Sequence, residues 1–340
     1  MPTAPAAPGS RRAWLTDGPV LLVAVVWGSS YLATKNITRE DTVITLLLLR
    51  FLIAVPLLGL VARRALRRLT ARELGGGGAL GLILAAVFLL ETYGVVHTSA
   101  TNAGLIISLT MVFTPLAEAA LNRTPPSRSF LAAAALSLLG VALLTQGTGF
   151  TAPSLGDLLM LLAAVTRTVN VLLIHRLPAV RNTDDAALTF VQLATAVAVF
   201  ALLTPMGGTG PWQLAASFTG AQWVNLLYLS VMCTLFAFFV QLWAVRRSSP
   251  SRVSLLQGTE PLWAAVIGVA LGGDHPGALG YLGAVLVLAG TTWGRRAAEH
   301  RPAPEHHLAP EHRPATDARP PHPRTLDAAP PAMKTPSTER

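Results

Sequence analysis

The chain has 340 residues, of which 52% are hydrophobic and only 13% are charged, and its net charge is +9 at pH 7. A soluble domain has roughly twice that charged fraction, and the apolar residues form long blocks, which excludes a soluble domain and an outer-membrane barrel. The arginines lie mostly at the ends of these blocks, which is typical of membrane-topology signals and not of a nucleic-acid-binding face.

Ten apolar runs predict an all-α membrane protein with ten transmembrane helices. Each run is close to the ~20 residues that cross the hydrocarbon core. Arg11 and Arg12 precede the first run as in a secretory signal, but the run contains Trp27 and Tyr31 and has no clear cleavage site, so we interpret it as an uncleaved span. The predicted spans are 18–36, 42–62, 75–96, 100–121, 128–146, 155–174, 186–205, 222–245, 251–272 and 277–294.

The basic residues between the spans predict the orientation of the chain. If residues 1–17 are a cytoplasmic segment, sixteen Lys and Arg residues lie on the cytoplasmic side, and only Lys35 and Arg39 lie outside. Basic residues favour the cytoplasmic side, so we expect a multi-pass protein of the inner or plasma membrane with both termini in the cytoplasm. The sixteen are Arg11, Arg12, Arg63, Arg64, Arg67, Arg68, Arg72, Arg123, Arg128, Arg176, Arg181, Arg246, Arg247, Arg252, Arg295 and Arg296.

The composition changes near the C-terminus. Residues 297–340 are rich in Pro, His, Arg and Ala and have almost no large apolar residues. Such a segment cannot bury a core. We therefore expect a disordered cytoplasmic tail, and we favour a solvated tail over a weak metal site at its histidines.

The two halves of the apolar region repeat a pattern. Ser108-Leu109 and Pro115-Leu116 have counterparts 146 residues later in Ser254-Leu255 and Pro261-Leu262. We therefore predict a first repeat at 18–146, a linker at 147–154 and a second repeat at 155–296. Each repeat has five spans, so the second must insert upside down, and inverted repeats are typical of secondary transporters with a site near mid-membrane.

Five short motifs follow one another in the two repeats. They are Val26-Trp27-Gly28-Ser29-Ser30-Tyr31, Leu49-Arg50-Phe51, Thr98-Ser99-Ala100-Thr101-Asn102-Ala103, Gly156-Asp157-Leu158-Leu159, and Glu260-Pro261-Leu262-Trp263 with Gly273-Asp274. In this order they resemble the EamA-type branch of the drug/metabolite transporter superfamily over about residues 18–296. The resemblance implies a ten-helix exporter of small metabolites or drugs, whose first, third, fourth, sixth, eighth and ninth helices line a central cavity.

The chain departs from the family pattern at three places. Asn122-Arg123 stands where the family often has Gly-Glu, Arg167 where an aromatic residue is common, and Glu91 where a neutral polar residue such as Gln is common. The last two departures affect the expected pocket, so the substrates of relatives do not simply transfer to this chain.

Four ionisable residues lie deep inside predicted spans, where charge is expensive and faces a polar cavity or a partner. Arg167 keeps its charge, so it needs an anion, which is Glu260, Glu91 or an acidic group of a substrate. We take an Arg167–Glu260 pair as a hypothesis. Arg50 and Glu91 lie at equal depth, which makes a second ion pair feasible.

The candidate site residues fall into two groups. The predicted substrate-binding or coupling residues are Arg167, Glu260, Glu91, Trp27, Tyr31, Gln257 and Gln241. Arg50, Pro261 and Pro115 are predicted to have a structural or gating role, since proline frees a backbone carbonyl and loosens a membrane helix. Ordinary packing is the alternative for the aromatic and amide side chains.

The sequence contains no GxxxxGK[ST] loop, no HExxH and no GxSxG elbow, so we expect no ATP hydrolysis, catalytic residue, cofactor or metal. We predict a secondary active exporter of small metabolites, such as amino acids, or of drugs, that works by alternating access. Proton coupling and uncoupled facilitated diffusion are both compatible with the acidic residues inside the spans. A lipid-handling protein is the main alternative, and a membrane-embedded enzyme is a weaker one.

Overall fold

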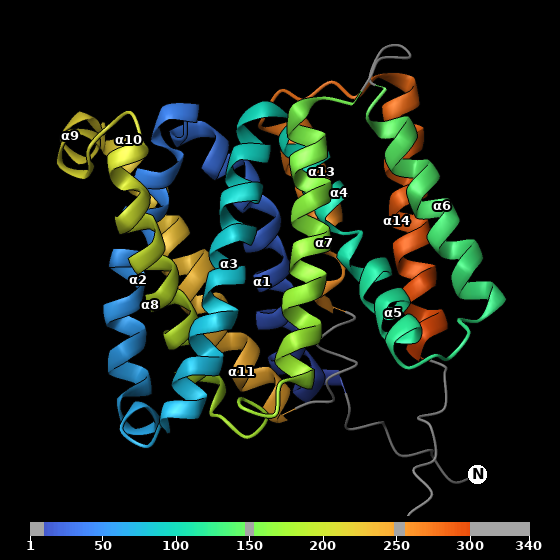
Figure 1. The fold of residues 1–340 in the computed structure, drawn as a ribbon. Helices are drawn as coiled ribbons and strands as arrows, with labels where there is room; N and C mark the ends of the chain where they lie inside the picture. Colours follow the sequence, from blue (N-terminus) through green and yellow to red (C-terminus); the bar gives the residue numbers. More distant parts are fainter. Residues whose placement is uncertain (1–9, 147–152, 248–255, 300–340) are drawn as a thin grey trace, which may run out of the picture. The chain divides into compact units, whose positions relative to one another are not determined.

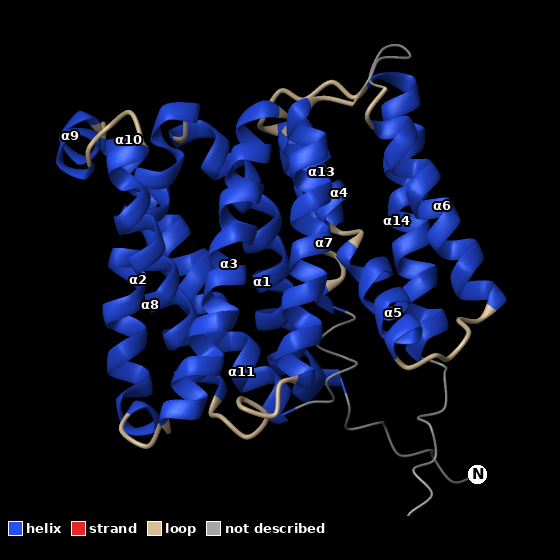
Figure 2. Cartoon of the chain, in the orientation of Figure 1, coloured by secondary structure: helices blue, strands red, loops and turns tan. Residues whose placement is uncertain are grey.

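The computed structural model describes residues 10–146, 153–247 and 256–299, and every regular element in these ranges is a helix (Figures 1 and 2). Eight of them are long and apolar enough to cross a membrane. Two shorter apolar helices, Arg128–Leu144 and Glu260–Ala270, fall within the two remaining predicted spans. The prediction of an all-helical chain is therefore confirmed, with eight candidate spans. Most of the predicted linker and nearly all of the predicted tail lie outside the described residues.

The first half contains one long interrupted helix. The fourth predicted span is broken at Ser108 and Leu109, and Ser108 Oγ donates to the Leu105 carbonyl at 2.6 Å. Hydroxyl groups satisfy backbone oxygens at such a break, where lipid cannot. Pro115 lies inside the following helix and not at the break. The elements are α1 (Ser10–Ile37), η1 (Glu40–Thr42), α2 (Val43–Leu66), α3 (Ala71–His97), α4 (Ala100–Ile107), α5 (Thr110–Leu121) and α6 (Arg128–Leu144).

The second half contains a π-helix in its third predicted span. This segment is η3 (Tyr228–Phe236), where Thr234 Oγ1 donates to the Leu229 carbonyl at 3.0 Å. Short π segments occur often at functional sites. The other elements are α7 (Leu155–Arg176), α8 (Asp185–Leu203), η2 (Thr204–Met206), α9 (Pro211–Ser217), α10 (Gly220–Leu227), α11 (Ala237–Arg247), α13 (Glu260–Ala270) and α14 (Gly277–Glu299).

Three helix ends differ from the predicted spans by five residues or more. α1 begins at Ser10, within the predicted N-terminal segment, and α14 continues to Glu299, into the predicted tail. α13 begins at Glu260, after a turn at Gly258 and Thr259, so the predicted span 251–272 is interrupted before Pro261. Proline suits the first turn of a helix, because its missing N–H has no partner there anyway.

The helices pack in matched pairs across the two halves. α1 packs along α13, and α7 packs along α4 and α5. α3 packs along α7 and α8, while the segment from α10 to α11 packs along α1 and α2. α6 and α14 lie side by side and contact mainly each other (Figure 1). The contacts of α1 with α13 and of α3 with α7 and α8 therefore each have a counterpart with the two halves exchanged.

One end of the helices is basic. The connections α2–α3, α5–α6 and α7–α8 lie at the lower end in Figure 1, while η1 and α9 lie at the upper end. The lower connections and the adjoining turns contain Arg63, Arg64, Arg67, Arg68, Arg72, Arg123, Arg128, Arg176 and Arg181. The Lys and Arg residues at the upper end around η1 are Lys35 and Arg39.

Glycines allow the central helices to approach closely. A Cβ atom on Gly28 of α1 would lie 2.7 Å from Trp263 Cβ and 2.8 Å from the backbone nitrogen of Ala264, both in α13. A Cβ atom on Gly104 of α4 would overlap Ala264 Cβ. Small residues permit such contacts between membrane helices, so α1, α4 and α13 meet at Ala264 with almost no side chain between them.

Replacing Gly28 with alanine tests this close approach. We expect Gly28→Ala to lower the unfolding midpoint in detergent, because overpacking costs about 1–3 kcal/mol. Gly75→Ala is the matched control, since a Cβ atom there meets nothing within 4 Å and alanine is the better helix former. A midpoint for Gly28→Ala as high as that of Gly75→Ala would contradict the close contact.

Candidate functional site

Two cavities lie between the central helices. The basic-side cavity, of about 280 Å³, is lined by Trp27, Gly104, Ile107, Ser108, Thr110, Met111, Arg167, Val171, Gln257, Gly258, Glu260 and Pro261. The opposite cavity, of about 100 Å³, is lined by Trp27, Ser30, Tyr31, Thr34, Arg50, Phe88, Glu91, Thr92, Val95, Arg167, Cys233, Thr234, Phe238 and Glu260. Trp27, Arg167 and Glu260 line both cavities, so they form the boundary between them.

Two polar contacts lie at this boundary. The Tyr31 hydroxyl donates to Glu260 Oε1 at 2.8 Å, and Arg167 Nη2 lies 3.3 Å from Glu91 Oε1. The Arg167 side chain is 38% exposed and that of Glu91 13% exposed, so the ion pair faces a cavity. We call these four residues the charged layer. Each half of the chain contributes two of them.

The packing of α3 against α7 decides which carboxylate Arg167 meets. A Cβ atom on Gly94 of α3 would lie 2.7 Å from Met160 Sδ of α7, so the two helices nearly touch one turn from Glu91. Arg167 therefore pairs with Glu91, in contrast to the hypothesis of an Arg167–Glu260 pair, and Glu260 is held by Tyr31. An Arg50–Glu91 ion pair is likewise not formed, because the ion pair of Glu91 is with Arg167.

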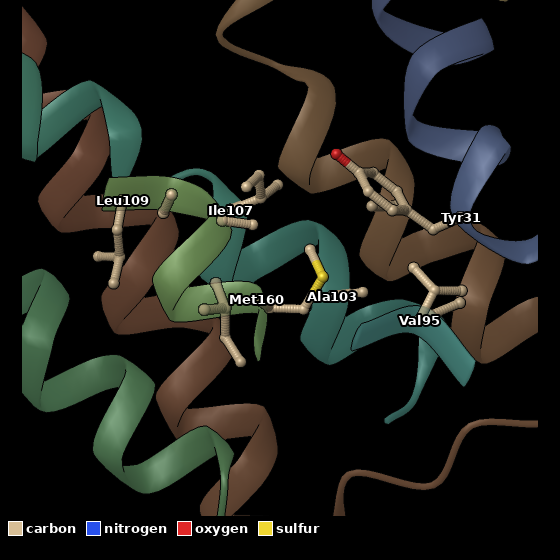
Figure 3. Close-up of a cluster of buried hydrophobic side chains, with 11 residues drawn as sticks. Tyr31, Val95, Ala103, Ile107, Leu109 and Met160 are labelled. Atoms are coloured by element: carbon tan, nitrogen blue, oxygen red, sulfur yellow. The ribbon is translucent and has the colours of Figure 1, made fainter. Parts of the chain in front are cut away.

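Tyr31 is held by an apolar cluster. It belongs to a buried cluster with Val95, Ala103, Ile107 and Met160, and its hydroxyl points away from Val95 (Figure 3). The cluster draws residues from α1, α3, α4, α7 and α13. Because packed side chains have few alternative rotamers, the cluster fixes the position from which the hydroxyl reaches Glu260.

Further hydrogen bonds attach α1 to the π-helix η3. Trp27 Nε1 donates to the Cys233 carbonyl at 2.9 Å, and Ser29 Oγ shares a hydrogen bond of 2.5 Å with Tyr228 Oη. Sequence analysis did not identify Ser29 or Tyr228 as site residues. Ser29 belongs to a motif that was recognised, whereas Tyr228 lies in an apolar run that gives no sign of its partner.

Arg50 lies in the opposite cavity, on α2. Its Nη2 atom is 3.4 Å from Thr234 Oγ1 of η3. Its guanidinium carbon is 5.3 Å from the centre of the Phe51 ring and 5.7 Å from that of Phe88. These rings attract the cation through their faces.

The remaining predicted site residues are divided among three places. Gln257 and Pro261 line the basic-side cavity. Pro115 is not among the residues that line either cavity. Gln241 belongs to α11, and its side chain lies outside the described residues.

Polar side chains join the helix ends beyond the opposite cavity. Asp157 accepts hydrogen bonds from Thr98 Oγ1 at 2.6 Å and Asn102 Nδ2 at 3.1 Å, and it also caps the start of α7. Asp274 accepts from the backbone and the hydroxyl of Thr101, both at 2.8 Å. Two aspartates therefore join the ends of α3, α4, α7 and α13 on this side. Sequence analysis recognised their motifs but not these contacts.

No metal site is evident in the described part of the chain. Across residues 10–146, 153–247 and 256–299, no three His, Cys, Asp or Glu side chains are grouped as metal ligands would be. The charged layer can instead hold a cationic group at its carboxylates and an anionic group at its arginine.

Comparisons with known proteins agree with this architecture. A model of the EamA-like transporter family matches residues 16–146 and 154–293. Two uncharacterized transporters of Archaeoglobus fulgidus are similar: one is 25% identical over 276 residues, covering 79% of this chain and 93% of the relative, and the other is 24% identical over 282 residues, covering 83% and 86%. A protein crystal structure shares the fold with a TM-score of 0.56 at 20% identity, covering 85% of this chain and 99% of that chain.

A double-mutant cycle tests the Arg167–Glu91 ion pair. We expect Arg167→Leu and Glu91→Leu each to lower the free energy of unfolding by about 1–3 kcal/mol, between the values for surface and for buried pairs, because Arg167 is partly exposed. The double variant should lose less free energy of unfolding than the sum of the two single losses, as measured by chemical denaturation in detergent.

A second double-mutant cycle, with Arg167→Leu and Glu260→Leu, provides the comparison. The losses of unfolding free energy in this cycle should be closer to additive. Additive losses for Arg167 and Glu91 would contradict the ion pair.

Proposed function

The chain belongs to the EamA-like transporter family, and from that premise we propose that it is a secondary carrier that exports small metabolites, such as amino acids or related compounds, or drugs. The observation that carries the proposal is the charged layer between two cavities. A carrier needs a central site that each side can reach in turn, with the halves of the protein moving around it. Tyr31 and Glu91 come from the first half, Arg167 and Glu260 from the second.

The proposed architecture is ten spans in two inverted repeats, 18–146 and 155–296. The short apolar helices α6 and α13 would be the two remaining spans, in addition to the eight long ones. The matched packing supports the repeat, since α1 on α13 corresponds to α7 on α4 and α5. The family match in two segments, 16–146 and 154–293, supports it as well.

In the proposed orientation the protein lies in the inner or plasma membrane, and its basic end and both termini face the cytoplasm. The basic-side cavity would then receive substrate from the cytoplasm, and the opposite cavity would release it outside. Val171 lies between Arg167 and the basic end of α7, which gives this cavity its direction.

The proposed coupling uses competition for Glu260. A cationic group of the substrate would be held by this carboxylate, and a proton on the same carboxylate would remove the charge that holds it. Proton and substrate would then occupy the site in turn, so that proton entry drives export. Tyr31 would donate to Glu260 when neither is bound, as it does here at 2.8 Å.

Transport by purified protein in sealed proteoliposomes tests the function. Uptake and counterflow would be measured with pooled labelled amino acids, organic anions and cationic drugs, with and without a pH gradient. We expect gradient-driven accumulation of one pool, and we expect Glu260→Gln to abolish that accumulation while exchange continues, because glutamine cannot carry a titrating proton.

Glu118→Gln is the matched control, since Glu118 is exposed on α5 and is not among the residues lining either cavity. It should transport like the wild-type protein. Folded protein that moves no pool under any gradient would overturn the carrier proposal and make lipid substrates the next test. Exchange without any response to the gradient would indicate facilitated diffusion.

A further inference from the structure

Arg50 is a cation in the opposite cavity, and among the described residues no carboxylate neutralises it at close range. Two carboxylates line the same cavity, but Glu91 forms its ion pair with Arg167, and Glu260 accepts a hydrogen bond from Tyr31. Glu91 interacts with Arg50 only over a longer distance. A cation at membrane depth is kept where it has a partner or a function.

Most of the hydrogen-bonding capacity of Arg50 is unused. A guanidinium group has five N–H donors in a rigid fork. In the described part of the chain Nη2 is bonded to Thr234 Oγ1, at the long distance of 3.4 Å, and the buried Nε has no hydrogen-bond partner. A buried donor without an acceptor is unfavourable, so an acceptor that enters this cavity would gain both the charge and the free N–H groups.

The surroundings hold the guanidinium group without satisfying it. The rings of Phe51 and Phe88 lie 5.3 Å and 5.7 Å from its central carbon. They stabilise the charge and restrict the side chain, but they accept no ordinary hydrogen bond. A restricted side chain loses less entropy when it binds a ligand. Arg50 is therefore arranged as a binding group would be.

The shape and charge of the cavity select the ligand. Its volume of about 100 Å³ is a few times the ~30 Å³ that one water molecule occupies in the liquid, so it takes a group of a few atoms. The buried hydroxyl-bearing residues Thr34 and Thr92 line the same cavity as Arg50. The two carboxylates nearby disfavour a doubly charged anion, and a planar fork suits a carboxylate.

We propose that Arg50, with Thr34 and Thr92, forms a binding subsite for the carboxylate group of a small monocarboxylic substrate. The ligand's carboxylate accepts hydrogen bonds from the guanidinium group, while Glu260 is left to hold an ammonium group if the substrate carries one. This assignment rests on the proposed carrier function for calling the ligand a substrate, but the binding itself requires no transport.

The only cysteine of the chain makes the subsite measurable. Cys233 lines the same cavity as Arg50, so its rate of modification by the small reagent methyl methanethiosulfonate reports occupancy without removal of any other thiol. The full-length protein in lipid nanodiscs would be incubated with propionate, with its neutral analogue propionamide, or with sodium chloride at the same ionic strength. Thermal unfolding midpoints under the same conditions provide a second readout.

We expect propionate to slow the modification of Cys233 and to raise the midpoint, and we expect propionamide and chloride to do neither. Arg50→Gln should weaken the effect of propionate by about tenfold or more, and Arg50→Lys should be intermediate because it keeps the charge but loses the fork. Arg63→Gln is the matched control, since Arg63 is exposed near the other end of α2.

Three results would overturn the subsite: no effect of propionate on either readout, an equal effect of propionamide, or a wild-type response in Arg50→Gln. An equal effect of chloride would replace the carboxylate by a simple halide site. If Arg50→Gln does not fold, the wild-type comparison and Arg50→Lys decide. Transport without a propionate effect would overturn this subsite alone, and propionate binding without transport of any pool would overturn the carrier proposal alone.

Discussion

Charge inside a membrane has to be compensated within the protein, because lipid supplies neither counter-charges nor hydrogen bonds. For Arg167, Glu91 and Glu260 the requirement is met by two contacts, Arg167 with Glu91 and Tyr31 with Glu260. Both join the first half of the chain to the second, and both lie one turn from a glycine where two helices nearly touch, Gly94 and Gly28 respectively. The charged layer thus depends on the tight helix crossings, since neither contact could form if the helices were farther apart.

The apolar runs alone predict most of the helices, because a length of ~20 apolar residues is a property of the membrane and not of the fold. The interruptions at Ser108 and Gly258 are different. The break at Ser108 lies several residues before Pro115, and the break at Gly258 lies one turn before Pro261. Both prolines were expected to loosen the helix. Where a helix breaks depends on which neighbouring groups accept its freed hydrogen bonds, and a single sequence does not contain that information.

The candidate site was predictable to the level of its residue types. Arg167, Glu91 and Glu260 were identified because charge in an apolar run is conspicuous, but the choice of Glu91 as partner depends on how α3 crosses α7. The π-helix η3 and the hydrogen bond from Trp27 to the Cys233 carbonyl have no local sequence signal. Arg50 was expected to have a structural or gating role, and its cavity appears only once α2, α3 and η3 are assembled.

Three residues separate the two cavities. Trp27, Arg167 and Glu260 line both spaces, so a change in the rotamers of these large side chains could connect them. A continuous file of water through the layer would conduct protons and dissipate the very gradient that could drive transport. If transport is coupled to protons as proposed, helices have to close one entrance before the charged layer opens. The fidelity of coupling then depends on the timing of a fast rotamer change relative to a much slower rearrangement of helices.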